Sequence, residues 1–160
     1  MVSDGQDLYK RILKSRKLDE QMLEVSLDNL PDEALFANID SVAERIREAI
    51  YNNEPMVIFG HDDPDGITST YILYNFLNSC GYQRHSYYIP NRNLESHGIQ
   101  QGFVDFVQKG GFKLVITVDN GISAYTGVEQ LNALGCDVLI TDHHLIQADM
   151  IPNAHSIMNP

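Results

Sequence analysis

The spacing of apolar positions differs between the two ends of the chain. In the first fifty residues the apolar positions recur at helical intervals, and the i, i+4, i+7, i+8 pattern of one helix face is followed by Val42, Ile46, Ala49 and Ile50. Asp40 or Ser41 is the expected N-cap of this helix. From Pro55 onward short apolar runs alternate with helical stretches. The pattern therefore predicts an N-terminal helical arm, residues 1–53, followed by a separate domain, residues 54–160.

The second part alternates strands and helices. Strands are predicted at 56–59, 84–89, 114–118 and 137–140, with the beginning of another at 156–158. Between them lie helical stretches, and the first has a stripe formed by Ile67, Tyr71, Tyr74 and Leu77. Strand-helix alternation implies βαβ units with right-handed crossovers. The predicted fold is therefore α/β, with a mainly parallel β-sheet flanked by helices.

Composition narrows the classes of protein that remain. The formal net charge is -11, and basic residues after position 54 are restricted to Arg84, Arg92, Lys109 and Lys113. This charge argues against a simple nucleic-acid-binding module, which needs a broad basic surface. Bound cations could still supply positive charge at a phosphoester site. The chain lacks a recognisable signal peptide or a long apolar span, so we expect a soluble, cytoplasmic protein without a membrane partner. Cys80 and Cys136 are expected to be buried, reduced thiols.

Three strings of acidic, histidine or amide residues each follow a predicted strand, and the strings are His61–Gly66, Val118–Gly121 and Thr141–His144. Ligands of open α/β sheets bind beyond the carboxyl ends of the strands, so we expect the strings to meet at one edge. Alone, the first string could be a turn with Asp65 as the N-cap of the following helix, and the second also reads as a turn. The third is less easily explained as a turn, because two adjacent histidines and an aspartate at a strand end have no packing reason to occur together. Taken together, carboxylates and imidazoles at three strand ends predict a metal site. Two aspartates and a histidine in the first string favour Mn²⁺, or Mg²⁺ with additional water ligands.

Three motifs of this chain resemble, in their order along the chain, those of the DHH phosphoesterase superfamily. They are His61-x-Asp63-x-Asp65-Gly66, Val118-Asp119-Asn120-Gly121 and Asp142-His143-His144. Within that superfamily, the segments 88–92, 97–99, 117–122 and 140–144 are similar to those of the RecJ single-strand DNA exonucleases. The resemblance covers roughly residues 40 to 160.

This resemblance implies a site with two divalent ions, Mn²⁺ or Mg²⁺, about 3.5 to 4 Å apart, which activate water and neutralise charge on the scissile phosphate. His61 and Asp63 would hold one ion, Asp65 and His143 would hold the other, and Asp119 would bridge them.

Four further roles follow from the same resemblance. His144 would contact the scissile phosphate or assist the leaving oxygen. Asp142 would orient the histidines, because a ligating imidazole usually donates its second N–H to a carboxylate or carbonyl. Arg92 would be a bidentate phosphate clamp, with His97 in the same loop also near the substrate phosphate.

The implied activity is 5′ to 3′ hydrolysis of single-stranded DNA in DNA repair and recombination. The family has a further metal-binding aspartate and a second, nucleic-acid-holding domain, and both are expected beyond Pro160, so residues 1–160 alone should bind metal weakly and degrade little DNA. One alternative is another DHH enzyme acting on oligoribonucleotides, adenosine bisphosphate or cyclic dinucleotides, which His61 favours and the segments 89–92 and 119–121 disfavour. Another alternative is an inactive replication scaffold, although such a protein tends to lose the metal ligands.

Overall fold

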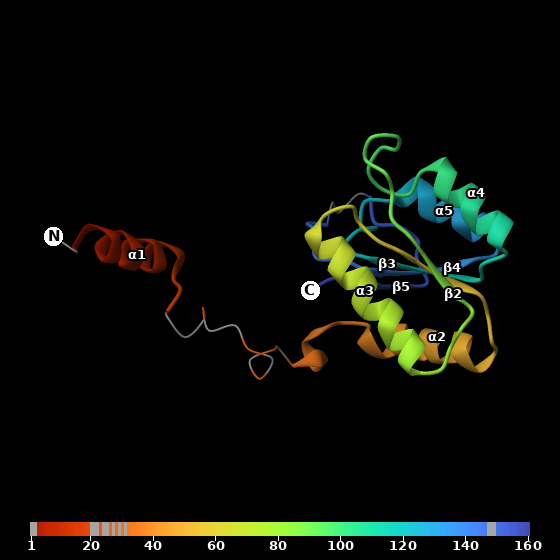
Figure 1. The fold of residues 1–160 in the computed structure, drawn as a ribbon, viewed down its shortest axis with the longest axis horizontal. Coiled ribbons are helices and arrows are strands. Elements are labelled where there is room, and N and C mark those ends of the chain that lie inside the picture. The colour runs from red at the N-terminus through yellow and green to blue at the C-terminus, as the bar shows by residue number, and fades with distance from the viewer. Residues whose placement is uncertain are drawn as a thin grey trace. The chain divides into compact units, whose positions relative to one another are not determined.

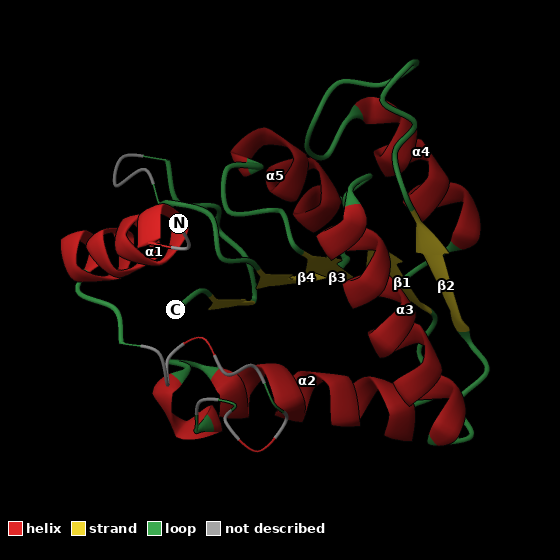
Figure 2. Ribbon diagram, turned by 60° about the vertical axis from the view of Figure 1, so that its left-hand side comes forward, coloured by secondary structure: helices red, strands yellow, loops and turns green. Residues whose placement is uncertain are grey.

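The computed structural model of the chain describes residues 3–19, 23, 26, 28, 30, 32–146 and 150–160. The described residues after position 33 form one compact unit, in which a parallel sheet is covered by helices on both faces (Figures 1 and 2). This arrangement confirms the predicted α/β class.

The elements follow one another in strand-helix alternation. The helices are α1 (Ser3–Arg16), the 3₁₀ turn η3 (Glu33–Leu35), α2 (Ile39–Tyr51), α3 (Pro64–Ser79), α4 (Gln101–Gly110) and α5 (Tyr125–Ala133). The strands are β1 (Met56–Phe59), β2 (His85–Tyr88), β3 (Leu114–Val118), β4 (Asp137–Thr141) and β5 (Ser156–Met158). Among the described residues these five strands pair in the order β2-β1-β3-β4-β5, all parallel.

The sheet is buried on both faces, which explains why its central strands are almost wholly apolar. Every residue of β1 and β3 is buried. On one face the side chains of α4 and α5 pack on Val57, Val115 and Val138, and on the other face α2 and α3 pack on Ile58 and Ile116. Parallel strands covered by crossover helices have no solvent face, so alternation of apolar and polar residues is not expected.

The order of the strands creates a switch point between β1 and β3. These strands are hydrogen-bonded neighbours, but the chain leaves β1 through α3 on one face and leaves β3 through α5 on the other. The two connections diverge, so a crevice opens beyond the carboxyl ends of β1 and β3. This crevice is where the first two polar strings of the sequence arrive.

Two local predictions are wrong. The N-cap of α2 is Asn38, in a left-handed conformation with φ of 67°, rather than Asp40 or Ser41. The buried stripe of α3 contains Gly66, Thr70 and Leu77, whereas Ile67 and Tyr71 are exposed. Leu77 is buried as the stripe predicts and Tyr74 packs against the core, so the displacement by one residue is confined to the first half of α3. There the helix approaches the end of β1 closely, where small residues are required.

Two further features differ from what the apolar pattern indicates. Cys136 is buried, but Cys80 is exposed at the end of α3, and both thiols are free. The compact unit begins at Ala34, so α2 belongs with the sheet, although the sequence pattern places it in the arm of residues 1–53. Of that arm, residues 1, 2, 20–22, 24, 25, 27, 29 and 31 lie outside the described residues.

A buried arginine joins α2 to the edge of the sheet at which the strands begin. Arg45 donates from Nη2 to Glu54 at 2.6 Å and from Nε to Asp137 at 2.7 Å. We expect Arg45→Met to lower the free energy of unfolding by about 1 to 3 kcal/mol, because two carboxylates lose their partner. Arg47→Met on the same helix is the control, since Arg47 pairs with Glu44 on the exposed surface and should change stability by less than about 0.5 kcal/mol. Urea unfolding measures both, and equal effects would contradict the assigned role of Arg45.

Candidate metal centre

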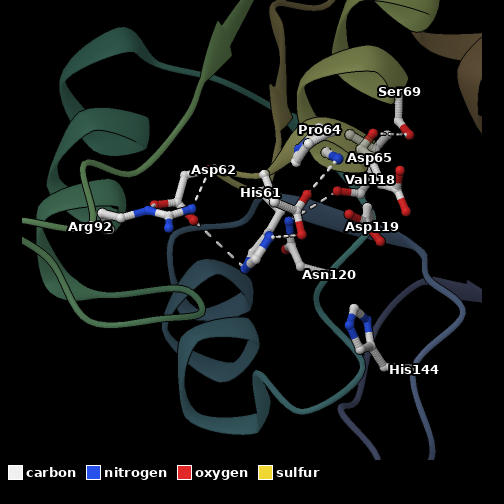
Figure 3. Close-up of polar contacts among 12 residues, drawn as sticks. His61, Asp62, Pro64, Asp65, Ser69, Arg92, Val118, Asp119, Asn120 and His144 are labelled. Atoms are coloured by element: carbon white, nitrogen blue, oxygen red, sulfur yellow. Dashed lines mark hydrogen bonds and ion pairs between the residues drawn. The ribbon is translucent and has the colours of Figure 1, made fainter.

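The polar strings meet at the carboxyl edge of the sheet, next to the switch point. Donor atoms of His61, Asp63 and Asp119 lie within 4.8 Å of one another, as do those of Asp119, His143 and His144. Asp119 is common to both groups, so the loops after β1, β3 and β4 converge on its carboxylate. Figure 3 shows His61 and Asp119 facing the same region from different loops.

Asp63 is held by the start of α3. It is the N-cap of this helix, and its Oδ1 accepts a hydrogen bond from the backbone N–H of Gly66 at 2.9 Å. This N–H keeps the pKa of Asp63 below its ordinary value, with the neighbouring His61 contributing. The cap is thus Asp63, whereas the turn interpretation of this string placed Asp65 in that role. A Cβ at Gly66 would lie 2.6 Å from the Cα of His61, so glycine is required for the tight return into the helix.

Asp119 is a buried residue with a left-handed backbone conformation at the end of β3. Its φ is 59°, a left-handed conformation that aspartate tolerates better than most residues and that turns the chain sharply at the end of β3. The residue is 8% exposed, and its Oδ1 lies 2.9 Å from Nε2 of His143. Burial, followed by the negative charge of Asp63, raises the pKa of Asp119. Such strain at a strand end is typical of a functional position.

Two buried donor atoms of the first group lack hydrogen-bond partners among the described residues. Oδ2 of Asp119 accepts no hydrogen bond, and Nδ1 of His61 lies 2.9 Å from Oδ2 of Asp63 in an orientation that makes none. Unsatisfied polar atoms in a buried position are costly and call for an explanation. A divalent cation fits these donors, because it would bind the carboxylate oxygens and the imidazole nitrogen together.

Asp65 stands apart from these groups. Its carboxylate is not among the donor atoms that lie within 4.8 Å of one another in the part of the chain that the structure describes. Asp65 does line a cavity of about 500 Å³ together with Asp119 and His143. The structure thus brings Asp65 to the same hollow as two other candidate ligands.

Asp142 organises the loop after β4. Its Oδ2 accepts the backbone N–H of Ile122 at 3.0 Å, and its Oδ1 accepts those of His143 and His144 at 2.7 and 3.1 Å. Nδ1 of His144 also lies 2.6 Å from Oδ1. The backbone N–H donors and His144 together lower the pKa of Asp142 although its burial opposes this, and the carboxylate in turn raises the pKa of His144. Asp142 therefore orients the ring of His144, while the ring of His143 turns to Asp119.

The loop after β2 brings Arg92 and His97 to the same edge. Arg92 is paired with Asp62, and the ring of His97 stacks on that of His61 with centroids 5.6 Å apart. His61, Asp62 and His97 form a third group of donor atoms within 4.8 Å. Arg92 thus lies beside the candidate ligands, but part of its guanidinium is already engaged.

Two further residues contribute to this region. Asp62, to which the sequence analysis assigns no role, contacts Arg92 and lies near His61. Asn120 donates from Nδ2 to the carbonyls of Val118 and Phe59, at 3.0 and 3.3 Å, and so joins the ends of β3 and β1. The sequence places Asn120 in the second polar string but does not reveal this link between the two strands.

Comparison with known proteins agrees with this geometry. The profile of the DHH family, N-terminal domain, matches residues 55–160. The chain belongs to the DHH family. Among curated DHH-family relatives, the single-stranded-DNA-specific exonuclease RecJ of Dickeya dadantii is 36% identical over 154 residues, and that of Escherichia coli strain K12 is 34% identical over 154 residues. These alignments cover 96% of this chain but only 27% and 26% of the respective relatives, so the chain spans about a quarter of their length.

A solved structure of a DHH-family relative, exonuclease RecJ bound to manganese, superimposes on this chain with a TM-score of 0.72 and 27% sequence identity. The superposition covers 82% of this chain and 32% of that one. Within the described part of this DHH-family chain, no helix has the length and apolar character needed to cross a membrane.

Proposed function

We propose that this chain forms the metal-binding wall of a phosphodiesterase site that hydrolyses single-stranded DNA, as a RecJ-like 5′ to 3′ exonuclease. The main support is Asp119, a buried carboxylate at the switch point. It belongs to two groups of donors, and its Oδ2 accepts no hydrogen bond from the described residues. Membership of the DHH family and similarity to relatives described as single-stranded-DNA-specific exonucleases point to the same substrate.

The proposed cofactor is a pair of Mn²⁺ ions. His61 and Asp63 would hold one ion, Asp65 and His143 would hold the other, and Asp119 would be shared. The convergence of two donor groups on Asp119 supports the sharing. When bound, the ions supply an activated water and positive charge to oppose the charge that develops on the phosphate. This supply matters because the chain itself carries a net charge of -11.

The protein side chains have complementary tasks. Asp142 fixes the ring of His144 through Nδ1, which leaves Nε2 of His144 free to face a phosphate oxygen or the leaving oxygen. Arg92 would hold a non-bridging phosphate oxygen through the N–H groups that Asp62 does not use. His144 and His97 line a cavity of about 360 Å³ together with Asp119, which has room for a phosphate group and part of a sugar.

The direct test uses the full-length protein with labelled single-stranded DNA. We expect hydrolysis with Mn²⁺, a loss of at least about 10²-fold after chelation, and recovery when Mn²⁺ is restored. Duplex DNA, short oligoribonucleotides, adenosine bisphosphate and cyclic dinucleotides are compared under the same conditions. Faster hydrolysis of any small substrate than of single-stranded DNA would move the assignment to another DHH activity. Tight Mn²⁺ binding without any hydrolysis would favour a scaffold.

A further inference from the structure

Among the lysines and arginines of the described residues 34–160, only Arg92 lies in a loop at the carboxyl edge of the sheet. The other lysines and arginines lie on helices or where strands begin, and these are Arg45, Arg47, Arg84, Lys109 and Lys113. A phosphate that reaches this edge would therefore meet a single guanidinium. Its position matters more than it would in a site with several arginine or lysine side chains.

The guanidinium is held by Asp62 through two hydrogen bonds. Nε of Arg92 donates to Oδ2 of Asp62 at 2.7 Å, and Nη2 donates to the backbone carbonyl of the same residue at 2.6 Å. The side chain of Asp62 is 13% exposed and that of Arg92 is 60% exposed, so the shielded carboxylate fixes the exposed cation. Figure 3 shows the two side chains meeting beside His61.

These contacts leave part of the guanidinium available. Of its five N–H groups, the Nε–H and one N–H of Nη2 bind Asp62. Both N–H groups of Nη1 and the other N–H of Nη2 make no hydrogen bond within the described part of the chain. The Nη1–Nη2 edge is suited to bidentate contact with two phosphate oxygens. Asp62 and a phosphate can therefore bind Arg92 at the same time, on different edges.

The same loop is fastened to the candidate ligands at a second point. His97 stacks on His61, and Asp62 lies between His61 and Asp63 in the chain. A small cavity lies between this loop and the loop after β1, and its lining includes His61, Asp62, Arg92 and His97. Movement of Arg92 relative to the donor groups is thus restrained by contacts at both ends of the loop.

We propose that Asp62 is a positioning residue that holds the guanidinium of Arg92 at a fixed place beside the donor groups, with its Nη1–Nη2 edge open to a phosphate of single-stranded DNA. This inference rests on the proposed function. Asp62 acts through Arg92 and does not itself hold a metal ion. Holding a long side chain in place before the substrate binds removes an ordering cost from binding, so the benefit appears in KM.

The test is a double-mutant cycle in the full-length protein, with Asp62→Ala, Arg92→Ala and the double variant, on 5′-phosphorylated single-stranded DNA with Mn²⁺. We expect Asp62→Ala to raise KM about 5- to 10-fold with kcat within about 2-fold of wild type. In the Arg92→Ala background the same change should have almost no further effect on KM. Asp62→Glu should recover part of the loss, and Asp105→Asn, on α4, should leave the kinetics at the wild-type level. Mn²⁺ affinity, measured by electron paramagnetic resonance, should be equal in wild type and Asp62→Ala.

Three results would overturn the inference. A lower KM in Asp62→Ala would mean that the carboxylate competes with DNA for Arg92. A full additional effect in the Arg92→Ala background, or weakened Mn²⁺ binding, would mean that Asp62 acts on the donor groups instead. Failure of the proposed function is recognised separately, because the wild-type protein would then not hydrolyse single-stranded DNA at all.

Discussion

Asp119→Asn should reduce hydrolysis of single-stranded DNA by the full-length protein about 10²- to 10³-fold or more. The change preserves the size of the side chain but removes the charge shared by both donor groups. The Mn²⁺ affinity of the chain should fall in parallel, as measured by electron paramagnetic resonance. Stability should be unchanged or higher by up to about 1 kcal/mol, because a buried carboxylate near Asp63 no longer opposes folding. Opposite changes in activity and stability distinguish a functional residue from a structural one.

The matched control is Asp105→Asn, which makes the same chemical change on α4, where Asp105 accepts a hydrogen bond from Gln101. It should keep wild-type activity and Mn²⁺ affinity. If Asp119→Asn retained more than about a tenth of the activity with a normal metal requirement, the assignment of Asp119 as the shared ligand would be wrong.

Asp142→Asn should damage both stability and activity. The carboxylate uses one oxygen for Ile122 and the other for His143 and His144, whereas an asparagine offers only one oxygen. At least one backbone N–H would therefore face an amide NH₂ and remain unsatisfied. We expect a loss of about 1 to 3 kcal/mol in the free energy of unfolding, measured with urea. The rate should fall about 10- to 100-fold, because His144 loses the partner that fixes its ring.

Glu44→Gln serves as the control for Asp142→Asn, since it removes one acidic charge from an exposed position on α2. It should change stability by less than about 0.5 kcal/mol and leave the rate unaffected. A stable Asp142→Asn variant with normal kinetics would show that the hydrogen bonds around Asp142 do not set the geometry of the loop.

The strands could be predicted from the sequence with small errors at their ends. The run Leu114–Val118 is β3, and the expected strand at 84–89 is His85–Tyr88 in the structure. Strands buried on both faces are short apolar runs, which are easily recognised between polar turns. The parallel order follows from the alternation with helices, and it places the polar strings at one edge.

Packing that depends on small residues could not be read from the apolar pattern. The stripe Ile67, Tyr71, Tyr74 suggested one buried face for α3, but the helix turns Gly66 and Thr70 toward β1. Close approach of the backbones requires small side chains, which contribute little to a hydrophobic pattern. The exposure of Cys80, the C-cap of α3, could not be read from the residue type either.

The sequence by itself determined the class of fold and the edge at which the chemistry gathers, because strand periodicity and parallel connections are local properties of the chain. Tertiary structure decided which side chains meet there: Asp119 with His143 across 24 positions, and Arg92 with Asp62 across 30. It also decided that Asp65 lies outside the groups of donor atoms formed by the described residues, and that none of those residues hydrogen-bonds to Oδ2 of Asp119. These outcomes depend on backbone angles such as the positive φ of Asp119 and on side-chain directions fixed by packing, and neither is contained in residue spacing.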